Sequence, residues 1–404
     1  LGLTSVFNLH YIFLLKYLKS LKYQSQPSQS PNYFFIYFFH YFPHFGISQS
    51  SVVGLKKGAG VDIVLSITSK RDVPTMVTFQ QKERSYGSQS QDIMKSHINS
   101  TIIYPPRYLG LQPDWDNGKF LEQEAKFSLA SPTVDSLLQR VAFDINYKGS
   151  EDKYYPESIM GIFLNKLKKQ FTGLCVDDKD ISVSVPDYFT VNERQAMIDA
   201  VAISDLKLIS LINESSANCL NYGLNRRANF DDKDPRIVAF VDVGQSKTSV
   251  FFGQFGKNLQ KVISVTNERN LGARDFDYAL VEYYSAIFQK KFGCNPMKNK
   301  KCIIRLIDVV SKARKILTGN NETSVSCESL MEDEDLHASL TRSEFEGIIA
   351  PFIERLKEIF KKSLVDAKLT IDKIHSVEMV GDAVRTPIIQ DAIKEIFNKE
   401  LSKT

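Results

Sequence analysis

The chain has 404 residues, of which 43% are hydrophobic and 24% are charged, and its formal net charge is +4. These values are typical of a globular protein with two or three domains. Basic and acidic residues are interspersed along the sequence, so they do not indicate a nucleic-acid-binding surface.

The cysteines and histidines indicate which disulfides and metal sites the chain could form. The five cysteines are odd in number and form no CxxC pair, which favours free thiols in a reducing compartment. The six histidines are scattered, so a dedicated transition-metal site is not indicated. The cysteines are Cys175, Cys219, Cys294, Cys302 and Cys327.

Residues 1–50 differ from the rest of the chain. They lack an initial methionine, and Tyr33–Phe45 is almost wholly aromatic. That run is too short to cross a bilayer as a helix, and we expect no membrane contact. We interpret residues 1–50 as an extension outside the main domain, disordered or an artefact of the gene model. A targeting segment, suggested by VFNLHYIFLL, and a functional domain are the alternatives.

The first half of the remaining chain predicts alternating helices and strands. Glu157–Phe171 has the period of an amphipathic helix, and Thr190 with Glu193 forms a capping box that opens another. This alternation is typical of an α/β sheet with covering helices. The expected strands are 61–68, 75–79, 181–185 and 207–212, and the other expected helices are 190–202 and one from Ser215.

The second half follows a polar surface connection at Arg226–Arg236. Three strand-like runs come first, and a second capping box at Thr341 and Glu344 opens a late helix. The alternation alone supports an α/β protein with more than one domain. The expected strands are 237–243, 248–255 and 259–266, and the expected helices are 273–290 and 303–317.

A strand and turn with the sequence VDVGQSK, Val241–Lys247, is the first candidate for phosphate chemistry. An Asp at a strand end can hold Mg²⁺ through water, and the following Gly lets backbone N–H groups approach phosphate. By itself the pattern is weak, because most such segments are plain β-hairpin turns. Here Asp242 follows Glu214 of NESSANCLNYGL by 28 residues, and that combination is specific.

Three segments, ISVSVPDYFT…NESSANCLNYGL, RIVAFVDVGQSKTSV and VEMVGDAVRTP, together resemble the 70-kDa heat-shock protein superfamily. VDIVLSITSKRDVP and LGARDFD make the 110-kDa branch the most similar one. The resemblance covers roughly Ser51–Thr404. It implies a two-lobed, actin-like ATPase fold of ribonuclease-H-like repeats, incomplete at both ends. Lobe I would be 51–226 and lobe II 227–404, and the family's substrate-binding domain would be absent.

The resemblance also implies a role for each motif residue. Asp242 would be the magnesium-side carboxylate, and Glu214 would order the metal's water shell as the one candidate catalytic group. Glu214 could equally act as an acid in the first turn of a helix. The rest of the second phosphate loop would be Gly244, Gln245, Ser246 and Lys247.

VEMVGDAVRTP resembles the family's adenosine loop. Asp382 replaces a glycine of that loop, and its charge should oppose phosphate binding unless it turns away. Ser311 replaces an acid in the helix that cradles adenine, and the cations of this helix could alternatively lie on a solvated face. The implied nucleotide-binding residues are Gly381, Asp382, Ala383, Arg385, Arg314, Lys315 and Thr318.

The first phosphate loop departs from the family pattern. If the chain is aligned on SVVG, Lys56 occupies the place of the acid, and if it is aligned on GVDIVL the turn is absent. Gln91 replaces the lysine that relatives place near the γ-phosphate, and Lys56 or Lys247 could supply some of the lost charge. Phosphoryl transfer needs a positioned metal, water and cation. We therefore expect a weak ATPase at most.

The resemblance implies an ATP-binding co-chaperone that uses ATP/ADP and Mg²⁺ and acts as nucleotide-exchange factor for a 70-kDa heat-shock chaperone. Unfolded polypeptide would bind only through the missing C-terminal domains. The alternatives are an ATP-hydrolysing chaperone and a nucleotide-free scaffold; a sugar kinase of the same fold has no support. We expect a cytoplasmic protein, with the nucleus as an additional compartment and the endoplasmic-reticulum lumen as the alternative.

Overall fold

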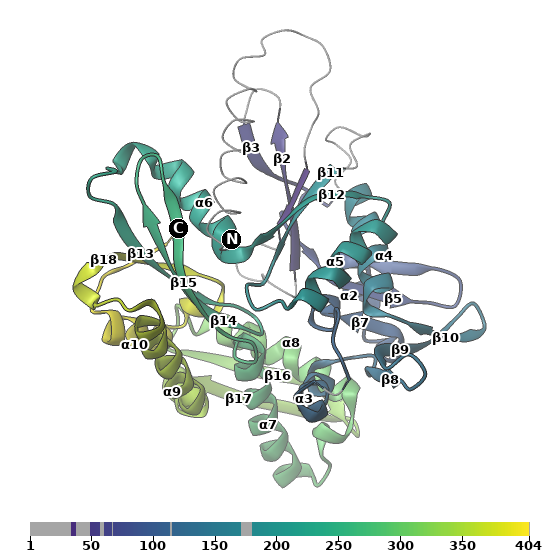
Figure 1. Cartoon of the computed structure of the whole chain (residues 1–404). Coiled ribbons are helices and arrows are strands. Elements are labelled where there is room, and N and C mark those ends of the chain that lie inside the picture. Colours follow the sequence, from purple (N-terminus) through teal and green to yellow (C-terminus); the bar gives the residue numbers. More distant parts are fainter. Residues whose placement is uncertain are drawn as a thin grey trace.

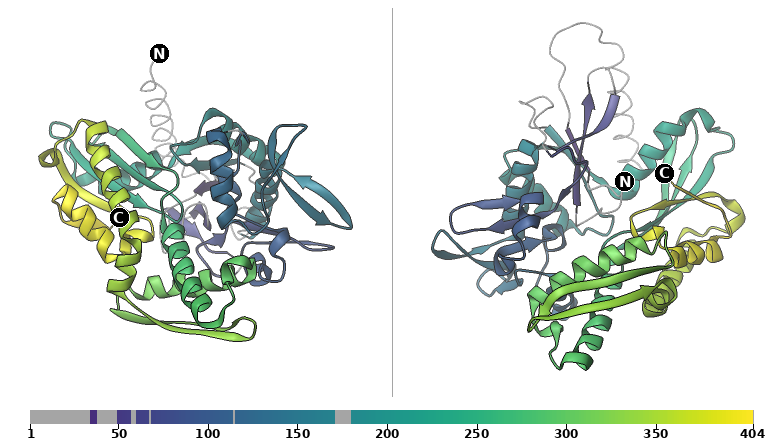
Figure 2. Two further views of the ribbon diagram at one scale, coloured as in Figure 1. Left: turned by 90° about the horizontal axis from the view of Figure 1, so that it is seen from below. Right: turned by 180° about the vertical axis from the view of Figure 1, so that it is seen from behind.

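The computed structural model describes residues 34–37, 49–56, 60–66, 68–113, 115–170 and 180–403. Elements before residue 214, purple to blue-green, lie mostly on one side, and those after residue 236, teal-green to yellow, lie on the other (Figures 1 and 2). Helix α6 (Glu214–Arg226) contacts strands of both halves. No helix of the described residues is long and apolar enough to cross a membrane.

Each half is built on a five-stranded path with the same topology. In each sheet three sequential strands pair antiparallel, and two later strands then add in parallel beside the first of them. In the first half the order is β3 (Gly60–Val64), β2 (Gln49–Lys56), β1 (Phe34–Tyr37), β11 (Asp180–Val185) and β12 (Lys207–Asn213). In the second it is β15 (Gln260–Glu268), β14 (Thr248–Phe255), β13 (Arg236–Val243), β18 (Ile374–Val380) and β19 (Leu401–Lys403).

This repeated topology confirms the predicted α/β fold of two ribonuclease-H-like repeats. The parallel strands of each sheet present their carboxyl ends at one edge, which is where open α/β sheets place ligands. The division at residue 226 stays a prediction. Helix α6 contributes Cys219 and Tyr222 to a buried cluster with Val238 and Phe240 of the second sheet.

The structure corrects the prediction for the first strand. Phe34–Tyr37, which we assigned to the extension 1–50, forms β1, between β11 and β2. Aromatic and β-branched residues favour strands, which suits FFIY to this place. β1 therefore corresponds to β13 of the second repeat, and the residues that connect β1 to β2, 38–48, lie outside the described residues.

Lys56 consequently does not stand in for the first acid. β2 runs antiparallel to β1, with Tyr37 opposite Ser51 and Phe34 opposite Gly54. Lys56 pairs with Gly60 at the hairpin beyond Gly54. It therefore lies at the edge of the sheet opposite the carboxyl end of β1.

Helices cover both sheets, and their predicted signals are mostly confirmed. Both capping boxes form: the Thr190 and Thr341 side chains accept the backbone N–H of Glu193 and Glu344, respectively. The helix expected from residue 303 begins at Lys300 instead, because Asn299 caps it. The larger helices are α4 (Pro156–Gln170), α5 (Val191–Ile203), α7 (Ala273–Phe292), α8 (Lys300–Ile316), α9 (Arg342–Ala367) and α10 (Pro387–Phe397).

Shorter elements complete the two halves. β4 (Val73–Pro74) pairs with β2, and three small sheets stand apart from the main ones. The strand expected at 61–68 ends at Val64. The remaining elements are β5 (Met76–Phe79), β6 (Arg84–Tyr86), α2 (Gly87–Ile93), β7 (Thr101–Ile103), α3 (Lys119–Phe127), β8 (Thr133–Asp135), β9 (Arg140–Tyr147), β10 (Ser150–Tyr154), β16 (Glu322–Met331) and β17 (Glu334–Thr341).

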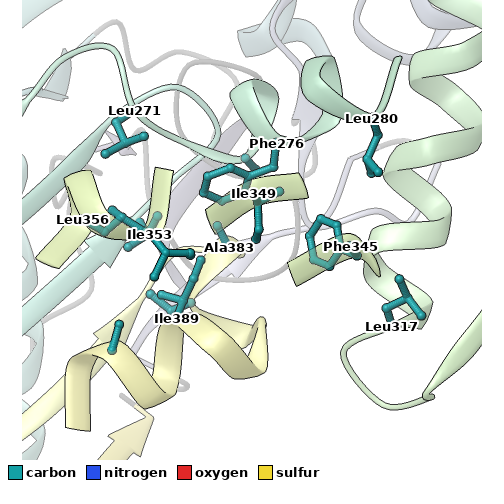
Figure 3. Close-up of a cluster of buried hydrophobic side chains, with 14 of the residues drawn as sticks. Leu271, Phe276, Leu280, Leu317, Phe345, Ile349, Ile353, Leu356, Ala383 and Ile389 are labelled. Atoms are coloured by element: carbon teal, nitrogen blue, oxygen red, sulfur yellow. The ribbon is translucent and has the colours of Figure 1, made fainter. Parts of the chain in front are cut away.

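Each half has its own apolar core. In the second half, Phe345, Ile349 and Ile353 of α9 pack with residues of α7 and α10 and with Leu317, which follows α8, as Figure 3 shows. Four cysteines, Cys219, Cys294, Cys302 and Cys327, are free thiols, as predicted. Cys175 lies outside the described residues.

Buried ion pairs join the two halves. Glu124 of α3 pairs with Arg107 of its own half and with Arg274 of α7 in the other half. A second pair links Arg269, which precedes α7, to Glu193 of α5 at 2.5 Å. These contacts hold α3 and α5 of the first half against the N-terminal end of α7 in the second half.

Candidate nucleotide site

The candidate site lies where the carboxyl ends of the parallel strands of both sheets meet. Glu214 follows β12, Asp242 lies near the end of β13, and Gly381 follows β18. Lys247 ends the turn between β13 and β14 and contacts both carboxylates. The structure thus brings together motifs that are far apart in the sequence.

The β13–β14 turn is the predicted second phosphate loop, and it is held rigidly. The backbone N–H of Gly244 donates to the carbonyl of Lys247 at 2.9 Å. Carbonyl groups of the turn accept from the first amides of α7, those of Ala273 and Arg274. Gly272 permits this approach, because a Cβ there would lie 2.6 Å from the Gln245 carbonyl carbon.

This turn offers donors to an anion. The backbone N–H groups of Gln245 and Ser246 find no acceptor among the described residues. The Ser246 hydroxyl is buried and likewise has no partner there. Successive free amides in a turn form a concave site for phosphate or other anions. The turn therefore has the backbone donors that the sequence predicted.

The sequence placed Lys247 in the phosphate loop but did not predict its contacts with two buried carboxylates. Its ammonium group donates to Glu214 Oε2 and lies 3.6 Å from Asp242 Oδ2. The side chain is only 3% exposed. Burial by itself would lower the pKa of Lys247, but the two carboxylates outweigh it and raise the pKa above the usual range. The group is therefore a permanent buried cation.

A third carboxylate, Asp187, adjoins this pair, and sequence reasoning missed it. It accepts hydrogen bonds from the Ser215 backbone N–H, at 3.0 Å, and from the Ser215 hydroxyl. Burial raises the pKa of Asp187, an effect that these hydrogen bonds and Lys247 only partly offset. The signal was present: Asp187 directly follows the strand-ending Pro186, at the edge where ligands bind.

The predicted magnesium donors do not fit a divalent ion. Asp242 and Glu214 were expected to hold Mg²⁺ through water, but both carboxylates lie against the Lys247 ammonium. Two unit charges about 4 Å apart interact by about 4 kcal/mol at an effective dielectric constant of about 20, so Mg²⁺ beside this ammonium would be opposed by roughly 8 kcal/mol. The lysine already supplies the positive charge that the metal would bring to these two carboxylates.

The loop predicted to bind adenosine packs directly on the end of β13, beside Asp242. Gly381 has φ of 86°, and a Cβ there would lie 2.4 Å from the Val243 carbonyl oxygen. Burial raises the pKa of Asp382, although nearby cations oppose this shift. Asp382 Oδ2 and the Thr386 hydroxyl are buried without a partner among the described residues. These are polar atoms that a nucleoside could satisfy.

The other predicted nucleotide contacts divide into two groups. Lys315 is half-buried near Asp382, and Arg385 Nε lies 4.0 Å from Asp382 Oδ1. Both therefore remain candidates beside the loop. Arg314, by contrast, is 2% exposed and donates to Asp277 at 2.7 Å, and Ala383 packs in the apolar core near Ile353 and Ile389 (Figure 3). Their contacts are those of structural residues.

Three further positions lie outside the set of candidate nucleotide contacts. The Thr318 hydroxyl donates to the Lys315 carbonyl at 2.7 Å, which closes the end of α8. Gln91, expected in place of the lysine near the γ-phosphate, is exposed on α2. Ser311 is half-buried, and its hydroxyl contacts the Asp308 carbonyl at 3.4 Å.

Comparison with known proteins decides the family. A family model described as "Hsp70 protein" matches residues 45–404, almost the whole chain. The chain belongs to the Hsp70 family. It is 33% identical over 362 residues to "Heat shock protein 88" of Dictyostelium discoideum, covering 89% of this chain and 46% of that protein.

Two more relatives place the chain within the Hsp70 family. It is 30% identical to "Heat shock protein hsp88" of Neurospora crassa, covering 88% of this chain and 50% of that protein. It is 31% identical to "Heat shock 70 kDa protein 16" of Arabidopsis thaliana, covering 88% and 46%. These relatives are of the 110-kDa type, as predicted. The chain spans about half the length of these relatives.

Close packing at Gly381 gives a stability prediction. Gly381→Ala should lower the free energy of unfolding by roughly 2–4 kcal/mol, because it adds left-handed strain to a clash with the Val243 carbonyl. Gly149→Ala is the matched control: its φ is 82°, but a Cβ would meet nothing within 4 Å. We expect about 1 kcal/mol there. Urea unfolding measures both, and equal losses would contradict the close approach at Gly381.

Proposed function

We propose that this chain binds ATP and ADP between its two halves and acts as a nucleotide-exchange factor for a 70-kDa heat-shock chaperone. Membership of a nucleotide-binding family supports the first part. The main support for nucleotide binding is the β13–β14 turn. There the amides of Gln245 and Ser246 and the buried Ser246 hydroxyl could donate to an anion. The loop Gly381–Arg385, which faces this turn, would contact the nucleoside.

The exchange activity rests on similarity to the 110-kDa branch. In this proposal ATP is a structural ligand, because a molecule that binds one arrangement of the lobes favours that arrangement by mass action. The lobes would then engage the lobes of the partner chaperone and speed ADP release. Client polypeptides would require further domains, so we propose no client site within these 404 residues.

Rapid ATP hydrolysis is not part of the proposal. Phosphoryl transfer needs a metal and a cation at the γ-phosphate, whereas Gln91 is exposed on α2 and the Asp242–Glu214 pair does not fit Mg²⁺. We also propose the cytoplasm as the compartment, with the nucleus as an addition and the endoplasmic-reticulum lumen as the alternative. The free thiols of the described cysteines suit a reducing compartment.

The binding step is tested by calorimetric titration of ATP and ADP into the purified chain, where we expect dissociation constants in the micromolar range or tighter. The exchange step is tested with a 70-kDa chaperone loaded with fluorescent ADP. Adding this chain with ATP should speed ADP release at least tenfold. A folded sample that binds neither nucleotide would overturn the first part; binding without faster release would overturn the second.

Lys315 provides a sharper test of the nucleoside side. Lys315→Ala should weaken ATP binding about tenfold, equivalent to about 1.4 kcal/mol, because it removes a half-buried cation beside the loop. Lys312→Ala is the matched control, since Lys312 is exposed on the same helix and the same charge is lost. We expect its affinity to stay within twofold of the original. Equal effects of the two variants would argue against nucleoside binding at this place.

A further inference from the structure

Lys247 joins the two halves of the molecule at the point where the nucleotide is proposed to bind. It belongs to the second sheet, at the end of the turn that docks on α7. Its nearest acid, Glu214, follows the last strand of the first sheet. The ammonium donates to Glu214 and also faces Asp242. A buried cation therefore sits between a carboxylate from each sheet.

We propose that Lys247 takes the place of a divalent cation in this site, so that the chain binds adenine nucleotide without Mg²⁺. The inference rests on the proposed nucleotide binding. An ammonium group carries three N–H donors. Glu214 accepts from one of them, which leaves donors for a phosphate oxygen. A lysine held in this way is a tethered cation that no chelator removes.

The surroundings supply the rest of the positive potential for the phosphates. The amides of Gln245 and Ser246 lie in the same turn as Lys247 and find no acceptor among the described residues. Lys315 and Arg385 lie beside the Asp382 loop. Because Asp242 and Glu214 are already neutralised in part by Lys247, a hydrated Mg²⁺ has little to gain from them.

The test compares ATP affinity with Mg²⁺ and with excess EDTA. For the unmodified chain we expect the dissociation constant to change less than threefold. The Lys247→Thr variant should bind ATP at least tenfold more tightly with Mg²⁺ than with EDTA, because loss of the ammonium group frees two acids for the metal. Lys257→Thr, an exposed lysine in the next hairpin turn, is the matched control and should behave like the original. A tenfold loss of affinity in EDTA for the unmodified chain would overturn the inference.

A second measurement separates this inference from the proposed function. Electron paramagnetic resonance of Mn²⁺, added without nucleotide, should show no ion bound by the unmodified chain at this site. Lys247→Thr, or Lys247→Met if the first variant does not fold, should bind one Mn²⁺, and adding Asp242→Asn should abolish it. If ATP binds under neither condition, the proposed function fails, and the Mn²⁺ measurement alone then tests the role of Lys247. Mn²⁺ bound by the original chain through Asp242, or by no folded variant, would overturn the role of Lys247.

Discussion

Glu124→Ala should lower the free energy of unfolding by about 3–5 kcal/mol, one of the largest losses expected for a single substitution here. The carboxylate is fully buried between two guanidinium groups. Arg274 donates to its two oxygens at 2.8 and 2.5 Å, and Arg107 donates to one of them. Removing the acid leaves two buried cations with like charge and no carboxylate between them, which is the costly way to break a buried ion pair.

The arginines have few other acceptors. Arg107 also donates to the carbonyl of Arg269 at 2.8 Å and to Asn270 at 2.6 Å, both in the second half. Loss of Glu124 should therefore loosen the contact between the halves as well as α3. Urea unfolding would measure stability, and small-angle scattering would report any opening. Glu122→Ala, exposed on the same helix, should cost less than about 0.5 kcal/mol. A Glu124→Ala loss as small as this would contradict the structure.

The same cluster predicts a dependence on pH. Burial opposes ionisation of Glu124, but Arg107 and Arg274 outweigh it and hold its pKa far below the usual carboxyl range. A depressed pKa in the folded state contributes stability above the unfolded pKa of about 4.3, and that stability is lost as the pH falls toward the folded pKa. The stability difference between the original chain and Glu124→Gln should thus be constant from about pH 6 to 8 and shrink below about pH 4.

Asp277→Ala should cost a similar amount, about 3–5 kcal/mol, because it strands the buried Arg314 guanidinium. The two side chains are 3% and 2% exposed and pair at 2.7 Å. Burial would lower the pKa of Arg314, but the charge of Asp277 outweighs this and raises it, so the arginine stays charged. Asp308→Ala is the control: its pair with Lys95 is on the surface and should contribute at most about 1 kcal/mol.

A double variant distinguishes a structural role of Arg314 from the nucleotide contact that the sequence implies. Asp277→Leu with Arg314→Met replaces the pair by apolar side chains and should recover most of the stability lost on removing Asp277 alone. If Arg314 is structural, calorimetry should find ATP affinity within about threefold of the original. A folded double variant that binds ATP at least tenfold more weakly would instead show that Arg314 contacts the nucleotide.

Local signals in the sequence were sufficient for much of the fold. The capping boxes at Thr190 and Thr341 depend on a side chain and a backbone group three residues away, so they form as predicted. Pairing between distant strands has no such local signal. FFIY was therefore assigned to an extension, although the structure inserts it between β11 and β2.

The candidate site shows the same division. The sequence was sufficient to predict the family, the α/β fold and the positions of Asp242, Glu214 and Gly381, because each of these residues is part of a short motif after a strand. The contacts of Lys247 and Arg314, by contrast, became apparent only once the chain was seen folded. A cation near a motif has the same appearance in sequence whether it faces solvent, phosphate or a buried acid. The partners of these two, Glu214 and Asp277, lie 33 and 37 residues away, and folding alone brings those charges together.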